Sequence, residues 1–210
     1  MTRIKICGMT CEQDISAANR FRPDYVGFVF AQSRRRVTPE TAWKLKSLLS
    51  PEIPAVGVFV NEPVPSVARL VSDRVIDLVQ LHGDEDEDYI RRLRREVSCP
   101  VILAVRVRSA RQVLAAEKLP CDLLLLDSFR KDRYGGSGER FDYSLIPPLK
   151  KPFFLAGGIG EQNIRDALRC RPYGVDVSSG AETDGRKDAG KIGRLVGIVR
   201  RCDMGKEGYR

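Results

Sequence analysis

The chain contains 210 residues, of which 42% are hydrophobic and 30% are charged. This length suits one large domain or two small ones, with enough apolar residues to bury a sizeable core. No apolar stretch approaches the ~20 residues of a membrane-spanning helix, and the first residues lack the long apolar run of a secretion signal. We therefore expect a cytoplasmic protein with no membrane partner.

The net charge of +8 brings nucleic-acid binding into consideration. The basic residues are spread widely, however, with local clusters only at 34–36 and 91–95. The second cluster follows the acidic run 84–88, an order that favours a solvent-exposed helix with carboxylates first and cations last. Aromatic residues do not alternate with the basic ones as a base-stacking surface requires. We expect no nucleic-acid partner, and an anionic small substrate explains the charge equally well.

The cysteines form no CxxC pair, and a single histidine leaves no usual Cys/His set for zinc. We therefore predict no metal site. We expect the thiols to be reduced and mostly buried as small hydrophobic groups. The six positions are Cys7, Cys11, Cys99, Cys121, Cys170 and Cys202.

Short β-rich stretches recur along the chain at intervals of 22 to 30 residues. Several are near-continuous apolar runs, such as 25–30, 55–60 and 101–105, which are typical of parallel strands buried on both faces. Eight such stretches begin near Thr2, Asp24, Pro54, Asp77, Pro100, Asp122, Pro152 and Gly174.

The segments between these stretches carry helical signals. Thr38 followed by Pro39 predicts an N-cap with proline in the first helical turn, and Ala42 and Leu45 begin an apolar stripe. Strand and helix alternating eight times predict a single-domain α/β fold, the (β/α)8 TIM barrel, over residues 1–201. An open doubly wound sheet is the alternative. Residues 202–210 read as a polar C-terminal tail that frays.

Active sites of such barrels lie at the carboxyl ends of the strands. Cys7 ends the first strand and Asp127 ends the sixth, which makes them candidates for a base and an acid. Each has a second interpretation, because Cys7 can be a packed thiol and Asp127 can cap the following turn.

Glycine-rich turns follow the seventh and eighth strands. Such turns expose backbone N–H groups, and at these two strands they predict a phosphate site. Its residues would be Gly157, Gly158, Ser179 and Gly180. A further glycine-rich loop at 134–138 could close over a ligand.

Three other strand-end residues have open roles. Arg36 can clamp a carboxylate with its planar guanidinium or remain a solvated surface group. His82 can pack in the core or contact a ligand. Asp176 can orient a sugar hydroxyl or pair with a basic neighbour inside the barrel.

The chain resembles the phosphoribosylanthranilate isomerases of tryptophan biosynthesis. The resemblance covers nearly the whole chain up to Val199, and its motifs occur in the family's order. They are KICGMT, DYVGFVF, SRRRVTP, VGVFVNE, VQLHG, LLLLDS, YGGSG with FDYSLI, LAGGI and VDVSSGAE.

This resemblance implies a cofactor-free barrel enzyme that isomerises N-(5-phosphoribosyl)anthranilate by an Amadori rearrangement, the third step of the tryptophan branch from chorismate. It implies Cys7 as general base, Asp127 as general acid and Arg36 as the group holding the anthranilate carboxylate. His82 and Asp176 match site-lining positions, and Gly157, Gly158, Ser179 and Gly180 match the phosphate site. We expect a small phosphoribosyl substrate and a monomer or homodimer.

Three rival functions remain at this stage. Another phosphosugar isomerase could use the same fold, although the related ribonucleotide isomerase of histidine biosynthesis has an aspartate where Cys7 stands. A nucleic-acid-binding protein would show affinity that falls steeply with salt. An inactive barrel that only binds a partner would not need the acid–base pair.

Overall fold

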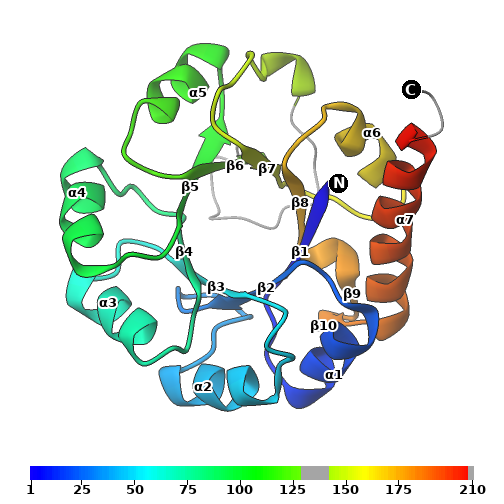
Figure 1. The fold of residues 1–210 in the computed structure, drawn as a ribbon, viewed down its shortest axis with the longest axis horizontal. Helices are drawn as coiled ribbons and strands as arrows, with labels where there is room; N and C mark the ends of the chain where they lie inside the picture. Colours follow the sequence, from blue (N-terminus) through cyan, green and yellow to red (C-terminus); the bar gives the residue numbers. More distant parts are fainter. Residues whose placement is uncertain (129–141, 208–210) are drawn as a thin grey trace.

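The computed structural model describes residues 1–128 and 142–207, with side chains up to Cys202. Eight parallel strands form a closed barrel in chain order, with β1 paired to both β2 and β8. The helices surround it, as Figure 1 shows. This confirms the predicted TIM barrel and rules out the open sheet. The strands are β1 (Arg3–Cys7), β2 (Tyr25–Val29), β3 (Ala55–Phe59), β4 (Leu78–Leu81), β5 (Val101–Val107), β6 (Leu123–Ser128), β7 (Phe153–Leu155) and β8 (Gly174–Val177).

Each connection carries a helix except the one between β6 and β7, where the described residues contain only the 3-10 turn η1 (Tyr143–Leu145). A second 3-10 turn, η2 (Ser179–Ala181), and a small hairpin of β9 (Glu182–Thr183) and β10 (Arg186–Lys187) follow β8. The α-helices are α1 (Glu12–Phe21), α2 (Pro39–Leu48), α3 (Val64–Ser72), α4 (Glu87–Glu96), α5 (Ala110–Glu117), α6 (Ile164–Arg169) and α7 (Ala189–Glu207).

The predicted helix starts are confirmed where capping residues mark them. Thr38 Oγ1 accepts a hydrogen bond from the backbone N–H of Thr41 at 3.2 Å, and Pro39 begins α2. Asp86 caps α4 in the same way through Tyr89, and that helix begins with acidic and ends with basic residues. Both caps satisfy N–H groups that the first helical turn leaves without partners.

The barrel interior is built in layers because side chains alternate along each strand. Its lower part is apolar and contains Val56, Ile102, Leu125 and Phe154. The larger core lies between the strands and the surrounding helices, where the other strand faces meet the apolar helix stripes. Parallel strands must be apolar on both faces for this reason, which explains their near-continuous apolar sequences.

Helix α7 reaches into the stretch predicted as a polar C-terminal tail. Helix α7 continues past Cys202 to Glu207, so the secondary structure does not change at residue 202. Met204, Lys206 and Glu207 have good helix propensity and extend the helix that Ile192 and Leu195 anchor in the core. The predicted closing loop at 134–138 lies outside the described residues.

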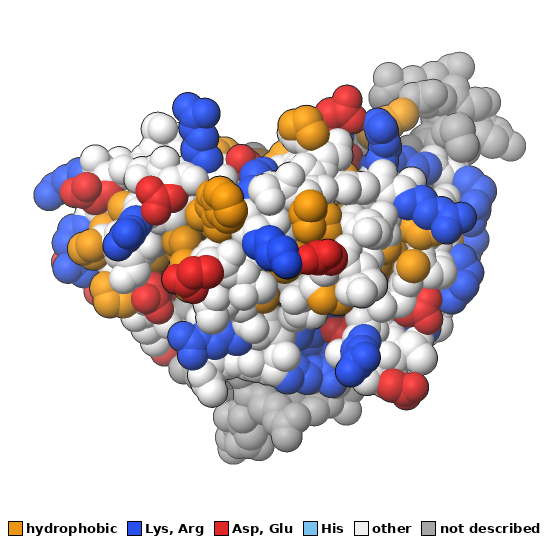
Figure 2. All heavy atoms as spheres, turned by 90° about the horizontal axis from the view of Figure 1, so that it is seen from below, with side chains coloured by type: hydrophobic (Ala, Val, Ile, Leu, Met, Phe, Trp, Pro, Cys, Tyr) orange, Lys and Arg blue, Asp and Glu red, His pale blue; other side chains and the backbone are white. Residues whose placement is uncertain are grey.

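The surface shown in Figure 2 carries Lys and Arg side chains interspersed with Asp and Glu. Within the described part of the chain, no helix is long and apolar enough to cross a membrane.

Candidate active site

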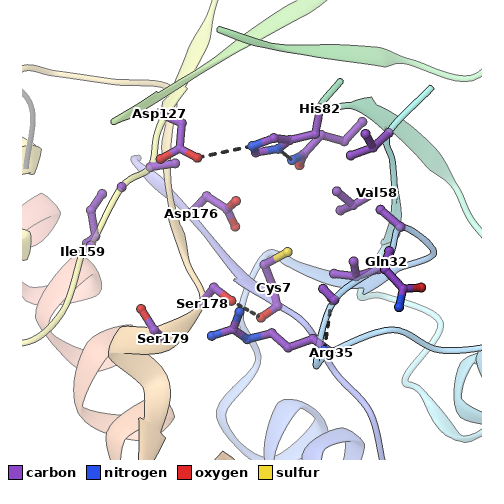
Figure 3. A pocket seen from close by; sticks show the side chains of 18 residues that line it. Cys7, Gln32, Arg35, Val58, His82, Asp127, Ile159, Asp176, Ser178 and Ser179 are labelled. Carbon is purple, nitrogen blue, oxygen red and sulfur yellow. Dashed lines mark hydrogen bonds and ion pairs between the residues drawn. The ribbon is translucent and has the colours of Figure 1, made fainter. Parts of the chain in front are cut away.

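At the carboxyl ends of the strands lies a cavity that opens to solvent. Both Cys7 and Asp127 line it, although their strands are not neighbours in the barrel. The closed sheet thus places the two candidate catalytic groups across one mouth (Figure 3). His82 and Asp176 also line the cavity.

Cys7 is buried at the end of β1, with 7% of its surface exposed. Gly8 follows with a positive φ of 87°, a conformation that turns the chain out of the strand at low cost. A Cβ on Gly27 of the adjacent strand would lie 2.8 Å from Cys7 Sγ, so that glycine leaves the thiol its space. Ser178 Oγ donates a hydrogen bond to the Cys7 carbonyl at 3.1 Å, which ties β1 to the end of β8.

The charge environment of the thiol is mixed. Burial raises the pKa of Cys7 above that of an ordinary thiol, and the negative charge of Asp176 adds to this. The cations of Lys5 and Lys187 act in the opposite direction. Lys5 and Lys187, which were not predicted as site residues, therefore limit the rise in the pKa of Cys7.

Asp127 is 4% exposed at the end of β6. Its Oδ1 accepts a hydrogen bond from the backbone N–H of Ser128 at 2.7 Å, the turn-capping contact that was the alternative interpretation. Its Oδ2 lies 3.3 Å from His82 Nε2, as the dashed line in Figure 3 marks. Asp127 therefore both caps the turn and faces the cavity, and its second oxygen meets the histidine.

A polar layer lies one side-chain step below the mouth. Lys5 Nζ, fully buried on β1, contacts both carboxylate oxygens of Asp176 at 3.1 Å and donates to Gln80 Oε1 at 2.8 Å. Burial acts to lower the pKa of Lys5, but the charges of Asp176 and Cys7 outweigh it and raise that pKa. Asp176 thus pairs with a basic neighbour, the second of its two predicted roles.

Lys5 and Gln80 were not predicted as site residues from the sequence. Both interrupt apolar strands two residues before a selected residue, Cys7 and His82 respectively. Residues two apart on a strand share a face, so this spacing was the available signal.

The two predicted glycine turns lie against each other beside the cavity. Gly157 and Gly158 have positive φ values of 86° and 63°, and both line the cavity together with Ser179. Gly180 does not line it. A Cβ on Gly180 would lie 2.0 Å from the carbonyl oxygen of Ile159, so its role in the described structure is to let the two turns pack closely.

The three consecutive arginines have different surroundings. Arg34 and Arg35 both bind the carboxylate of Glu182, each with a contact of 2.6 Å, and Arg35 lines the cavity. Arg36 is exposed and is not part of the cavity wall. Its Nη1 donates to Gln32 Oε1 at 3.3 Å, and Gln32 does line the cavity, so Arg36 stands at the rim.

Glu182 organises this side of the mouth. It lies on β9, and the turn Asp184-Gly185, with φ values of 50° and 79°, returns the chain so that Lys187 Nζ also reaches its carboxylate at 2.7 Å. Lys187 Nζ donates in addition to the carbonyl of Ser178 at 3.1 Å. The hairpin thereby fixes Arg35 against the cavity.

The described residues include no cluster of three or more His, Cys, Asp or Glu side chains that could hold a metal ion.

The closed barrel, with an acid, a thiol and two glycine turns at the carboxyl ends of its strands, defines the class of (β/α)8-barrel enzymes. Sequence comparison specifies the family: the model of the N-(5'-phosphoribosyl)anthranilate (PRA) isomerase family matches residues 4–197. The chain belongs to this family, whose members are isomerases of tryptophan biosynthesis.

Individual relatives support the same family assignment. The chain is 47% identical over 201 residues to the N-(5'-phosphoribosyl)anthranilate isomerase of Endomicrobium trichonymphae, covering 95% of this chain and 99% of the relative. The crystal structure of the Thermotoga maritima phosphoribosyl anthranilate isomerase superposes with a TM-score of 0.86 at 35% identity, covering 96% and 100% of the two chains. A phosphoribosyl anthranilate isomerase in complex with reduced 1-(o-carboxyphenylamino)-1-deoxyribulose 5-phosphate superposes with a TM-score of 0.81 at 33% identity, with the same coverage.

Proposed function

We propose that this protein isomerises N-(5-phosphoribosyl)anthranilate to 1-(o-carboxyphenylamino)-1-deoxyribulose 5-phosphate. Asp127 is the general acid and Cys7 the general base. The observation that carries this proposal is their placement across one cavity, on strands β6 and β1, with the glycine turns at its side. The reaction is the third step of the tryptophan branch from chorismate, and we place it in the cytoplasm.

The reaction starts with ring opening. Asp127 transfers a proton to the furanose ring oxygen, the C1–O bond breaks, and the nitrogen lone pair forms a protonated C=N bond at C1. Asp127 becomes a carboxylate, whose charge the N–H of Ser128 stabilises at 2.7 Å. This step needs an acid inside the cavity, and Asp127 is the candidate on the wall opposite Cys7.

The second step removes a proton from carbon. The positive charge of the protonated imine acidifies the C2 hydrogen, and the thiolate of Cys7 takes that proton to give an enolamine. The enolamine then tautomerises to the ketone. The imine cation also favours the thiolate electrostatically, in the same sense as Lys5 and Lys187. Acid and base must act from opposite sides of the sugar, as β1 and β6 allow.

Two further contacts hold the ends of the substrate. The turns at Gly157, Gly158 and Ser179 would bind the phosphate through backbone N–H groups, with Gly180 keeping the turns together. Arg36 would bind the anthranilate carboxylate. Glu182 occupies the guanidinium of Arg35 through contacts of 2.6 and 3.0 Å, whereas the contact of Arg36 with Gln32 is to a neutral amide. Of these two arginines, Arg36 is therefore the one whose guanidinium has no carboxylate partner among the contacts of the described residues.

Loss of phosphoribosylanthranilate fluorescence on addition of purified protein tests the proposal. We expect turnover that persists in EDTA, since the proposed proton transfers require neither metal nor cofactor. The double variant Cys7→Ser/Asp127→Asn gives the background rate. Absence of turnover by the wild-type protein would overturn the assignment.

A further inference from the structure

Gln80 lies between the buried lysine and the histidine of the mouth. It is 1% exposed, and both ends of its side-chain amide are in contact: one end with Lys5 Nζ at 2.8 Å, the other with His82 Nδ1 at 2.8 Å. An ammonium group only donates hydrogen bonds, so the amide atom that faces Lys5 must be the oxygen.

This orientation determines the protonation of His82. Because Oε1 of Gln80 faces Lys5, its NH2 group faces His82 Nδ1 and must donate to it. Nδ1 is then unprotonated, and a neutral ring carries its proton on Nε2. The Nε2–H group lies 3.3 Å from Asp127 Oδ2. It has no well-aligned hydrogen bond within the described residues, as is common for catalytic contacts before substrate binds.

The alternative protonation states are unfavourable. An imidazolium would place an N–H on Nδ1 against the NH2 group of Gln80 at 2.8 Å, two donors facing each other. Reversing the amide would relieve that conflict only by placing its NH2 group against the ammonium of Lys5. In a buried site, a donor without a partner keeps the full cost of its desolvation. Arg106, on the neighbouring strand β5, donates a hydrogen bond to the backbone carbonyl of His82 at 3.2 Å.

We propose that Gln80, held by Lys5, is a positioning residue that keeps His82 in the Nε2–H tautomer, so that the proton of the acid resides on Asp127 and not on His82. When Asp127 releases this proton to the substrate, its new carboxylate accepts from both His82 Nε2–H and Ser128 N–H. The catalytic consequence rests on the proposed function, since it requires Asp127 as general acid. The assignment of the His82 tautomer does not rest on the proposed function.

The chain contains a single histidine, so nitrogen NMR of ¹⁵N-labelled protein reports His82 without assignment. For the full wild-type chain at neutral pH we expect an unprotonated Nδ1 and a protonated Nε2. An imidazolium or an Nδ1–H tautomer would overturn the inference. If the protein shows the expected tautomer but no turnover, the proposed function fails while the assigned arrangement stands.

Gln80→Glu makes the sharper test. The isosteric carboxylate provides an acceptor at Nδ1, so we expect Nδ1 to gain a proton and kcat to fall about 10–100-fold, a part of the full general-acid effect, with KM within about threefold. Gln112→Glu, the same change on α5, should alter neither the histidine spectrum nor kcat. An unchanged spectrum in folded Gln80→Glu would contradict the proposal. If circular dichroism shows that this variant does not fold, the wild-type spectrum alone decides.

Discussion

Across the barrel mouth, the wall that carries Asp127 differs from the wall that carries Cys7. Asp127 is held by a hydrogen bond from the N–H of Ser128, and its other oxygen lies 3.3 Å from His82 Nε2. The thiol of Cys7 is controlled by charges, with Lys5 and Lys187 opposing burial and Asp176. The difference matches the proposed roles. A proton donor must present its proton in one direction, whereas a base must be kept ionised in a dry site.

The largest expected effect comes from removing either catalytic group. Cys7→Ser should lower kcat about 10²–10⁴-fold, because a serine hydroxyl gives up its proton far less readily than a thiol does. The fluorescence assay measures the rate, and thermal unfolding checks that the variant is folded. Cys11→Ser is the matched control and should keep wild-type turnover. A near-normal rate for Cys7→Ser would remove this residue from the base role.

Asp127→Asn tests the other wall with the same assay. We expect a loss of about 10²–10⁴-fold in kcat, since the amide cannot supply the ring-opening proton. Asp142→Asn, at the exposed N-cap of η1, is the control because asparagine also caps. Equal rates for Asp127→Asn and the control would exclude Asp127 as the acid.

Lys5→Met tests the buried ion pair between Lys5 and Asp176 in the polar layer below the mouth. It leaves the carboxylate of Asp176 buried without its cation, and we expect a loss of about 3–5 kcal/mol in the free energy of unfolding. Arg3→Met, two residues earlier on β1, removes a half-exposed ion pair and should cost at most about 1 kcal/mol. Urea unfolding at pH 7 compares them. Similar losses for both would mean that the buried pair is not the stabilising element.

Arg36→Met tests the carboxylate contact at the rim. We expect KM for phosphoribosylanthranilate to rise about 10–100-fold with little change in kcat, the loss of about 1.5–3 kcal/mol for a hydrogen bond to a charged group. Arg34→Met, whose partner is Glu182, should change KM by less than about threefold. The reverse order of effects would assign the substrate contact to Arg34 and not to Arg36.

The smallest effect concerns Glu182 and depends on pH. Burial alone would raise the pKa of Glu182, but Arg35 and Lys187 outweigh it and hold that pKa below its usual value. The folded state thus binds the proton less readily than the unfolded state, so the contribution is present above the ordinary carboxyl pKa and is lost as pH falls through the lowered one.

Glu182→Gln should therefore cost about 1–3 kcal/mol at pH 7, and the deficit relative to wild type should shrink at pH ~3. Urea unfolding at the two pH values measures it. Glu52→Gln, in an exposed pair with Arg22, should cost less than about 1 kcal/mol at either pH. A deficit that grows on acidification would contradict the assigned direction.

Local patterns in the sequence were sufficient for the fold and for part of the site. The spacing of apolar stretches predicts eight strands, and Thr38-Pro39 predicts the start of α2. Strand ends alone select Cys7, His82, Asp127 and Asp176, because closure of a parallel barrel brings all such ends to one mouth. They do not separate Arg35 from Arg36. The two arginines differ only in the folded chain, where Glu182, distant in sequence, forms an ion pair with Arg35.

The sequence by itself determined the barrel, its order of strands and the residues available at its mouth, since these follow from local periodicity and turn chemistry. Only the tertiary structure decided how those residues are connected. Lys5 meets Gln80 across 75 positions and Asp176 across 171, contacts that exist only after the sheet closes. Protonation of buried groups depends on such neighbours, and the tautomer of His82 is therefore a property of the closed barrel.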